Sequence, residues 1–306
     1  MGHLNEVSRY NLWATDLKEI LQRVEDPSYW TTQFSEMKIE ALEPQWLPET
    51  PFSNSEKDRM TIDGYFVQKG LLAGQPIIPR LKNTVTTLFG EGMLPLWASV
   101  FDEYWELARL AQPSIKAILG ADYKLLPDTW AWFLAPHNLT QGWAPHRDRL
   151  ERTLRSDGRP MSITLWVSLT DATPENGCMY FLPASLDPNY PDNLTLKIDN
   201  WQDIRAVPVP EGSLMGWNQT ILHWGGRSSQ WASNPRISIA FEAQCTDVPA
   251  FNEPLLEPNE RPSFEMRLAL IGKQLLQYQH MYQLSDIYRQ LGTALAQHAE
   301  TCTIPA

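Results

Sequence analysis

The segment Trp143-Ala144-Pro145-His146-Arg147-Asp148 places an imidazole and a carboxylate two residues apart. If the segment is extended, its side chains alternate between two faces, so His146 and Asp148 point the same way while Arg147 points elsewhere. A neutral imidazole nitrogen beside a carboxylate oxygen suits iron, manganese or zinc better than calcium, which prefers oxygen ligands alone. The pair therefore predicts two ligands of a divalent metal site that a second histidine would complete.

The chain has six histidines from which the third ligand can come. His223 is the strongest candidate, because it follows a glycine-bounded strand pattern and precedes Trp224-Gly225-Gly226, a turn that would leave its ring at a strand end. His137 lies in a loop-like sequence close to the motif and is a candidate for supporting the ligands. The remaining histidines have no acids at ligand spacing and are expected to be exposed or structural: His3, His280 and His298.

Arg236 begins the strand pattern Arg236-Ile237-Ser238-Ile239-Ala240-Phe241. A buried guanidinium is costly unless an anion meets it, because it stays charged at physiological pH. One interpretation is an internal ion pair with Asp or Glu, and the other is a bidentate clamp for a ligand carboxylate near the metal. Taken together with His146, Asp148 and His223, the arginine favours the clamp.

Composition narrows the functional class. The chain of 306 residues carries 36 acids against 25 bases, a net charge of -11, which disfavours nucleic acid and anionic membranes as partners. Its three cysteines are far apart, no apolar run reaches membrane-spanning length, and the first residues lack a signal core. These features predict a cytoplasmic protein, a monomer or homodimer, that acts on a small molecule.

The element pattern predicts an all-β core with flanking helices, an α+β fold. Short strands separated by turn residues, without helices between them, indicate an antiparallel sandwich or barrel. We expect one domain over residues 1–306, with an N-terminal cover (1–60), a core with packing helices (61–250) and C-terminal helices (260–300) capped at Ser263. The expected strands are 63–67, 129–134, 162–170, 178–182, 206–209, 213–217 and 236–244, and the expected helices include 12–24, 79–88 and 96–119.

Together these residues resemble the phytanoyl-CoA dioxygenase-like (PhyH) branch of the iron(II)- and 2-oxoglutarate-dependent oxygenases, over roughly residues 63–244. The resemblance rests on Pro145-His146-Arg147-Asp148, on the run 165–179 with Thr173-Pro174-Glu175-Asn176-Gly177-Cys178, on Leu182-Pro183-Ala184-Ser185, and on His223 with Arg236. The histidine-aspartate pair alone is a weak signal, and the Thr-Pro-Glu-Asn-Gly-Cys run at the right distance after it makes the signal specific.

The resemblance implies a double-stranded β-helix, the jelly roll of cupin-like proteins. It also implies that His146, Asp148 and His223 hold Fe²⁺, that Arg236 clamps the distal carboxylate of 2-oxoglutarate, and that Trp166 lies beside this cosubstrate. Two histidines and one carboxylate with open positions suit such oxygen chemistry. In this family O₂ and 2-oxoglutarate give succinate and CO₂ while a C–H bond of the substrate is oxidised. Asp148 argues against halogenation and for hydroxylation, desaturation or ring chemistry.

The chain departs from the family pattern at three positions. Arg147 stands where relatives often have Gln, which predicts altered packing or a substrate contact. Gly225 stands where a Ser commonly helps to hold the cosubstrate, and Ser238, on the Arg236 face of a regular strand, is its expected substitute. The gap between His223 and Arg236 is longer than usual, which makes Arg227 a competing clamp.

The substrate is less well defined by the sequence. Trp132 and Trp143 flank the motif and predict an aromatic lining for an apolar or ring-bearing ligand, while Arg147 and Arg149 are candidate contacts for an anionic one. A natural product or other small metabolite is the first expectation, and an acyl-CoA the second. The competing functions are a noncatalytic jelly-roll binding protein and a cupin-type isomerase or hydrolase that uses zinc or manganese.

Overall fold

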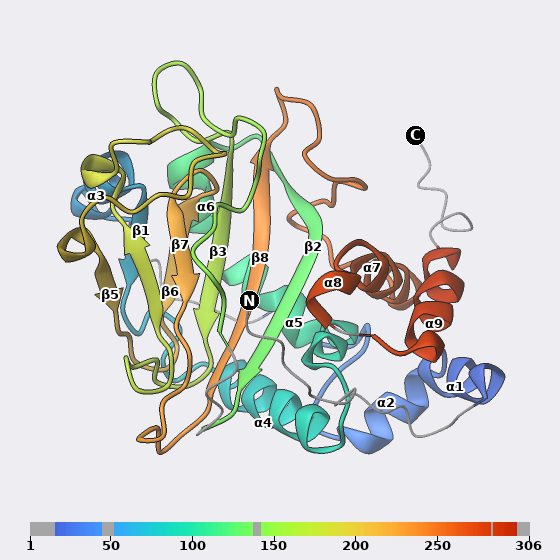
Figure 1. Ribbon diagram of the computed structural model, residues 1–306. Coiled ribbons are helices and arrows are strands. Elements are labelled where there is room, and N and C mark those ends of the chain that lie inside the picture. The colour runs from blue at the N-terminus through green and yellow to red at the C-terminus, as the bar shows by residue number, and fades with distance from the viewer. Residues whose placement is uncertain (1–15, 45–51, 137–141, 283, 299–306) are drawn as a thin grey trace.

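The computed structural model describes residues 16–44, 52–136, 142–282 and 284–298. Two antiparallel sheets form the centre of the molecule and helices flank them, so the fold is α+β (Figure 1). The larger sheet has the order β1 (Tyr65–Gln68), β6 (Leu214–Asn218), β3 (Ser162–Ser168), β8 (Arg236–Cys245), β2 (Tyr123–Leu134). The smaller sheet has the order β5 (Arg205–Val207), β4 (Met179–Leu182), β7 (Leu222–Gly225).

The two faces of the larger sheet have different surroundings, as β8 illustrates. Ile237, Ile239 and Phe241 point to one face and join the main hydrophobic core. Arg236 and Glu242 alternate with them and line a cavity on the other face. A second, smaller core between the sheets includes Trp166, Met179, Phe181, Met215 and Trp217. One strand therefore contributes to the core with one face and to the cavity with the other.

Helices supply the other half of the main core. In Figure 1, α4 and α5 lie along the larger sheet, and α7 to α9 lie beyond β2. No helix within the described ranges is long and apolar enough to cross a bilayer. The helices are α1 (Leu17–Val24), α2 (Pro27–Gln33), α3 (Asn54–Asp63), α4 (Ile77–Gly90), α5 (Asp102–Leu110), α6 (Gln112–Leu119), α7 (Phe264–Gln277), α8 (Gln279–Tyr282) and α9 (Asp286–Ala296), with short 3-10 turns η1 (Pro95–Val100), η2 (Ala184–Leu186) and η3 (Trp201–Asp203).

The sequence predicted one continuous helix over 96–119, and this prediction is wrong. The segment forms η1, α5 and α6 instead, because Phe101 adopts an extended conformation (φ -95°, ψ 149°) and Pro113 begins a new helix. Ser263 caps α7 as expected, since its side chain accepts a hydrogen bond from the Met266 amide. The helix expected over 12–24 corresponds to α1, which ends at Val24 as predicted. Residues 12–15 of the expected helix lie outside the described part of the chain.

A buried ion pair connects the helical layer. Asp102 and Arg267 are both almost fully buried, and Arg267 Nη2 lies 2.7 Å from Asp102 Oδ1. Asp102 also accepts hydrogen bonds from the backbone amides of Glu40, Ala41 and Leu42. Burial alone would raise the pKa of Asp102, but Arg267 and the amides outweigh it and hold the pKa below its usual value. The pair thereby joins α5, α7 and the segment after α2.

We expect Asp102→Ala to lower the free energy of unfolding by about 3–5 kcal/mol, because it leaves the Arg267 guanidinium buried without its carboxylate. The matched control is Glu19→Ala, which breaks an exposed pair with Arg23 and should cost no more than about 0.5 kcal/mol. Urea denaturation followed by circular dichroism measures both. If Asp102→Ala lowers the free energy of unfolding no more than Glu19→Ala does, the buried ion pair does not stabilise the helical layer as we expect.

Candidate metal centre

The segment that carries the histidine-aspartate motif lies against β7. The His146 amide donates to the His223 carbonyl (2.9 Å) and the His223 amide donates back to the His146 carbonyl (3.0 Å). The Trp143 amide donates to the Gly225 carbonyl (3.0 Å) and the Asp148 amide to the Gln219 carbonyl (3.1 Å). His223 is the second residue of β7, and Trp224 and Gly225 continue this strand, so the turn predicted at Trp224-Gly225-Gly226 is wrong. The pairing brings the motif directly beside the third histidine.

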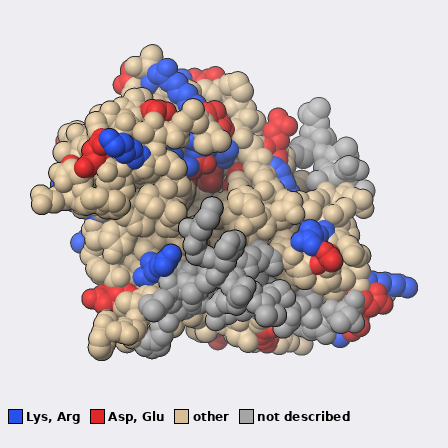
Figure 2. Space-filling view, in the orientation of Figure 1, with Lys and Arg blue, Asp and Glu red and all other residues tan. Residues whose placement is uncertain are grey.

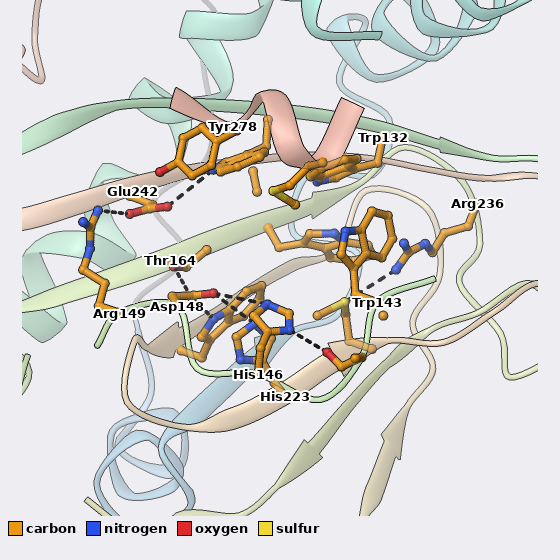
Figure 3. Close-up of a pocket in the computed structure, with 18 of the residues that line it drawn as sticks. Trp132, Trp143, His146, Asp148, Arg149, Thr164, His223, Arg236, Glu242 and Tyr278 are labelled. Carbon is orange, nitrogen blue, oxygen red and sulfur yellow. Dashed lines mark hydrogen bonds and ion pairs between the residues drawn. The ribbon is translucent and has the colours of Figure 1, made fainter. Parts of the chain in front are cut away.

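His146, Asp148 and His223 converge on one point. One potential ligand atom from each lies within 4.8 Å of the others. His223 Nε2 is 3.3 Å from Asp148 Oδ1, and His146 Nε2 is 3.6 Å from the same oxygen (Figure 3). Imidazole nitrogens and a carboxylate oxygen at this spacing are able to hold one divalent transition metal ion.

Backbone carbonyls fix the orientation of both imidazoles. His146 Nδ1 lies 2.9 Å from the Ala144 carbonyl oxygen, and His223 Nδ1 lies 3.1 Å from the Ile221 carbonyl oxygen. Since a carbonyl only accepts, Nδ1 carries the proton in each ring and Nε2 offers its lone pair to a metal. Burial, followed by the neighbouring His223, lowers the pKa of His146 and so favours its neutral form.

Two donors from the larger sheet fix the carboxylate. Thr164 Oγ1 on β3 and Trp217 Nε1 on β6 donate to Asp148 Oδ2 at 2.7 and 2.8 Å. This leaves Oδ1 directed at the histidines. Burial alone would raise the pKa of Asp148, but His223, His146 and the Thr164 hydroxyl outweigh it and hold the pKa well below its usual value. The carboxylate is therefore ionised and oriented in advance.

A cavity of about 420 Å³ opens above these residues. This volume lies within the range typical of small-molecule sites. Figure 2 shows the surface hollowed near the middle of this face, with acidic and basic atoms in the hollow. The lining is rich in aromatic side chains and includes Trp130, Trp132, Trp143, Trp166, Trp217 and Tyr278. Charged side chains lie at two ends, with Arg236 at one end and Glu242 and Arg149 at the other (Figure 3).

Arg236 is 1% exposed and makes no ion pair with any residue that the structure describes. Its Nη1 lies 3.5 Å from Met179 Sδ, its Nε has no hydrogen-bond partner in the described residues, and its guanidinium lies 5.5 and 5.9 Å from the rings of Trp143 and Trp166. Burial lowers the pKa of Arg236 to about 10, which still leaves it charged at neutral pH. The cavity thus contains a buried cation that lacks an anion.

The competing clamp and the auxiliary serine lie in different surroundings. Arg227 is exposed and does not contribute to the cavity lining. Ser238 is fully buried next to Arg236 on the same face of β8, and its hydroxyl has no hydrogen-bond partner among the described residues. The geometry therefore favours Arg236 over Arg227 as the cation available to a bound ligand.

At the opposite end of the cavity, Glu242 pairs with Arg149, which also contacts Asp128 outside the lining. Arg149 Nη2 lies 2.7 Å from Glu242 Oε2 and 3.5 Å from an oxygen of Asp128. Gln219 Nε2 also donates to Glu242 Oε2 (2.6 Å), and Trp130 Nε1 donates to Oε1 at 3.4 Å. Burial, together with Asp128, raises the pKa of Glu242 to about 8 despite the opposing effect of Arg149.

The structure corrects the expectation of a substrate contact at Arg147. Its side chain is fully buried away from the cavity, pairs with Asp187 at 2.7 Å, and donates to the carbonyls of Thr195 and Thr220. Period-two alternation directs it off the metal face, and the loop after β4 covers it there. The other candidates, Trp132, Trp143, Arg149 and Trp166, line the cavity.

The remaining histidines lie apart from the ligand set. His280 on α8 is exposed and contributes to the cavity wall, and His298 contacts Glu25 at 2.9 Å. His3 and His137 lie outside the described residues, so the supporting role expected of His137 stays a prediction.

Several residues of the site escaped the sequence interpretation: Thr164, Trp217, Gln219, Glu242 and Tyr278. Glu242 had a detectable signal, because it is a carboxylate inside an otherwise apolar strand and shares a face with Arg236. Thr164 likewise shares a face with Trp166. Trp217 and Tyr278 gave no such signal, since an aromatic residue in a strand or helix is more often a core residue.

Comparison with known proteins agrees with this site. Residues 95–233 match the family described as Phytanoyl-CoA dioxygenase (PhyH), which is a little less than half of the chain. It is 27% identical over 172 residues to phytanoyl-CoA dioxygenase domain-containing protein 1 of Bos taurus, a match that covers 55% of this chain and 54% of that protein. The chain thus spans about half the length of this curated relative.

The fold is similar to that of HygX from Streptomyces hygroscopicus, whose crystal structure holds nickel and 2-oxoglutarate. The TM-score is 0.52 at 15% identity, over 66% of this chain and 91% of that one. A second HygX structure, with nickel, 2-oxoglutarate and hygromycin B, gives a TM-score of 0.48 at 14% identity, over 66% and 91% of the two chains. The first similarity supports the α+β arrangement of two antiparallel sheets, and the second is too low to bear on this chain's ligand.

We expect Thr164→Val to weaken divalent metal binding about 10- to 100-fold, because Asp148 loses one of the two donors that orient it. Calorimetric titration with Mn²⁺ measures the affinity. The control is Thr61→Val, whose hydroxyl donates only to the Lys57 carbonyl of its own exposed helix turn. If both variants bind Mn²⁺ like the wild type, the orienting role of Thr164 is wrong.

The raised pKa of Glu242 predicts a pH-dependent stability. Between the usual pKa of a glutamate, 4.5, and about 8, the native state keeps a proton that the unfolded chain has released. The free energy of unfolding should therefore fall as pH rises through this window, by up to about 1.4 kcal/mol per pH unit from this group. In Glu242→Gln the side chain has no proton to release. The free energy of unfolding of this variant, measured by urea denaturation, should therefore increase relative to that of the wild type from pH 5.5 to 7.5. If the two free energies change with pH in the same way, the raised pKa of Glu242 is wrong.

Proposed function

We propose that the protein is an Fe²⁺- and 2-oxoglutarate-dependent dioxygenase that oxidises a C–H bond of a small organic molecule. The observation that carries this proposal is Arg236, a buried guanidinium that lines the same cavity as the three potential metal ligands and has no carboxylate partner among the described residues. A buried charge of this kind is costly unless a ligand neutralises it. A cosubstrate carboxylate supplies the missing anion.

The residues fit a ferrous ion. His146, Asp148 and His223 supply two imidazole nitrogens and one carboxylate oxygen from adjacent positions, and His-His-carboxylate sets with open positions suit Fe²⁺ oxygenases. Each ligand is oriented by a further hydrogen bond, from the Ala144 and Ile221 carbonyls for the imidazoles and from Thr164 and Trp217 for the carboxylate. A zinc- or manganese-dependent hydrolase could use the same three ligands. That function, however, gives no reason for the buried charge of Arg236.

Arg236 and Ser238 fit the distal carboxylate of 2-oxoglutarate. Arg236 offers planar paired donors, and the Ser238 hydroxyl lies next along the same strand face without a partner in the described residues. Trp143 and Trp166 flank the guanidinium and exclude water from it, which strengthens its attraction for an anion. In this proposal the two sheets are the double-stranded β-helix of the family, with the ligands at one mouth.

When bound, Fe²⁺ with 2-oxoglutarate and O₂ supplies the oxidation of a substrate C–H bond, coupled to release of succinate and CO₂. The protein binds the cosubstrate carboxylate through Arg236 and surrounds the substrate with indole rings. The aromatic cavity of about 420 Å³ favours a compact, ring-bearing natural product or metabolite. An acyl-CoA is the second candidate, and it would have to leave its nucleotide outside this volume.

We expect Arg236→Gln to raise the 2-oxoglutarate concentration needed for half-maximal binding at least about 100-fold, because a buried charge-assisted pair is lost. Anaerobic titration of the Fe²⁺ protein, followed by the visible charge-transfer band, measures binding, and aerobic succinate release measures turnover. The matched control is Arg227→Gln, an exposed arginine outside the cavity, which should behave like the wild type. If folded wild-type protein shows neither the charge-transfer band nor succinate release, the proposed dioxygenase function is wrong. If Arg227→Gln weakens 2-oxoglutarate binding more than Arg236→Gln does, the role of Arg236 is wrong.

A further inference from the structure

We infer that the end of the cavity opposite Arg236 is a subsite for a cationic nitrogen of the substrate, a protonated amine or a quaternary ammonium, held by Glu242, Trp130 and Tyr278. This inference rests on the proposed function, because it assigns the Arg236 end of the same cavity to 2-oxoglutarate. Arg236 and Glu242 are six residues apart on β8, about 20 Å along the strand, and Figure 3 shows them at opposite ends of the site. A cosubstrate at Arg236 thus leaves the Glu242 end to the substrate.

The first argument is unused acceptor capacity on a buried carboxylate. Glu242 is 5% exposed, and its Oε2 accepts both close hydrogen bonds, from Arg149 and Gln219. Among the described residues, its Oε1 accepts only one hydrogen bond, a long one of 3.4 Å from the Trp130 indole N–H. In Figure 3 this oxygen lies on the side of Glu242 that faces Tyr278, away from Arg149. A cationic donor would complete its coordination.

The second argument is the local balance of charge. Arg149 lies between Glu242 and Asp128, so two carboxylates share one guanidinium. Lys273 lies behind Asp128, and its ammonium donates to Asn252, whose amide nitrogen in turn donates to Asp128. Neither Lys273 nor Asp128 lines the cavity. Glu242 and Arg149 both line the cavity at this end, and Glu242 is the acidic residue of the lining there.

The third argument is the aromatic wall around this oxygen. The rings of Trp130 and Tyr278 lie 4.5 Å apart, and those of Trp130 and Trp132 lie 5.3 Å apart. Aromatic rings attract cations, and more strongly where water is excluded. An acidic side chain beside several rings matches an ammonium group with apolar substituents, because the cation stabilises the ionised acid and is attracted by the rings.

The protonation of Glu242 agrees with this arrangement. Without a cation in the cavity, burial and Asp128 keep its pKa near 8. A bound ammonium supplies the positive charge that stabilises the ionised form, so the proton leaves when the cation binds. The free protein thus holds a neutral acid at a place where the complex holds an ion pair.

Choline and its uncharged carbon isostere 3,3-dimethyl-1-butanol test the subsite, because the two have the same shape and differ in charge. Quenching of tryptophan fluorescence gives their dissociation constants for the full-length protein, both as purified and loaded anaerobically with Fe²⁺ and 2-oxoglutarate. We expect choline to bind the wild type at least about tenfold more tightly than the alcohol, and Glu242→Gln to abolish this preference. Equal affinities in the wild type, no choline binding, or a preference that persists in Glu242→Gln would each overturn the proposal.

Glu151→Gln is the matched control. Glu151 also faces Arg149, at 3.8 Å, but it is exposed and lies outside the cavity lining. This variant should keep the preference for choline. If Glu242→Gln does not fold, Trp130→Leu decides the question, because it should weaken choline binding more than alcohol binding, and an equal loss would overturn the proposal.

The outcome separates the subsite from the proposed function. A protein that shows the charge-transfer band with Fe²⁺ and 2-oxoglutarate but no preference for choline retains the function and loses the subsite. A protein that prefers choline but forms no such band and releases no succinate retains the subsite and loses the function.

Discussion

The paired hydrogen bonds between His146 and His223 are the constraint on which the site depends. They join a segment without regular strand structure to β7 in the smaller sheet, and so place the imidazoles side by side. The carboxylate of Asp148 is then held from the larger sheet, by Thr164 on β3 and Trp217 on β6. The ligand set therefore spans both sheets. Its geometry depends on how closely the sheets pack, and the small core of Phe181, Met215 and Trp217 sets that spacing.

The alternation of β8 explains how a strongly apolar fold carries charges at both ends of one cavity. Every second residue packs into the helical layer, and this large apolar interface fixes the register of the strand. The intervening residues must then face the cavity, including Arg236 and Glu242, whatever their desolvation costs. Glu242 is compensated by Arg149 and Gln219, but Arg236 has no such compensation within the described residues. The two charges therefore differ: no described residue neutralises Arg236, whereas Glu242 is paired through Oε2 and keeps Oε1 with only a long hydrogen bond from Trp130.

Local sequence pattern was sufficient for the parts of the site that depend on short-range geometry. The two-residue spacing of His146 and Asp148, the face shared by Arg236 and Ser238, and the cap at Ser263 all follow from the periods of strands and helices. Pattern failed where the deciding partner is distant in sequence. Arg147 points away from the metal as predicted, but nothing near it indicates the loop with Asp187 that buries it. The break at Phe101 and the short strand β7 depend in the same way on tertiary packing, which a local period does not encode.

The departure from the family pattern at Gly225 has a packing reason. A Cβ atom at this position would lie 3.0 Å from both Arg236 Nη1 and Trp143 Cε3, closer than such atoms ordinarily approach. The absence of a side chain therefore admits the Trp143 indole next to the guanidinium, where its ring centre lies 5.5 Å from the arginine. A serine here would compete with Trp143 for the same space. Ser238, on β8 in the other sheet, has its hydroxyl on the same strand face as Arg236. The absence of a Cβ atom at Gly225 thus lets the Trp143 indole cover the guanidinium that lines the cavity, and this cover is part of what buries Arg236.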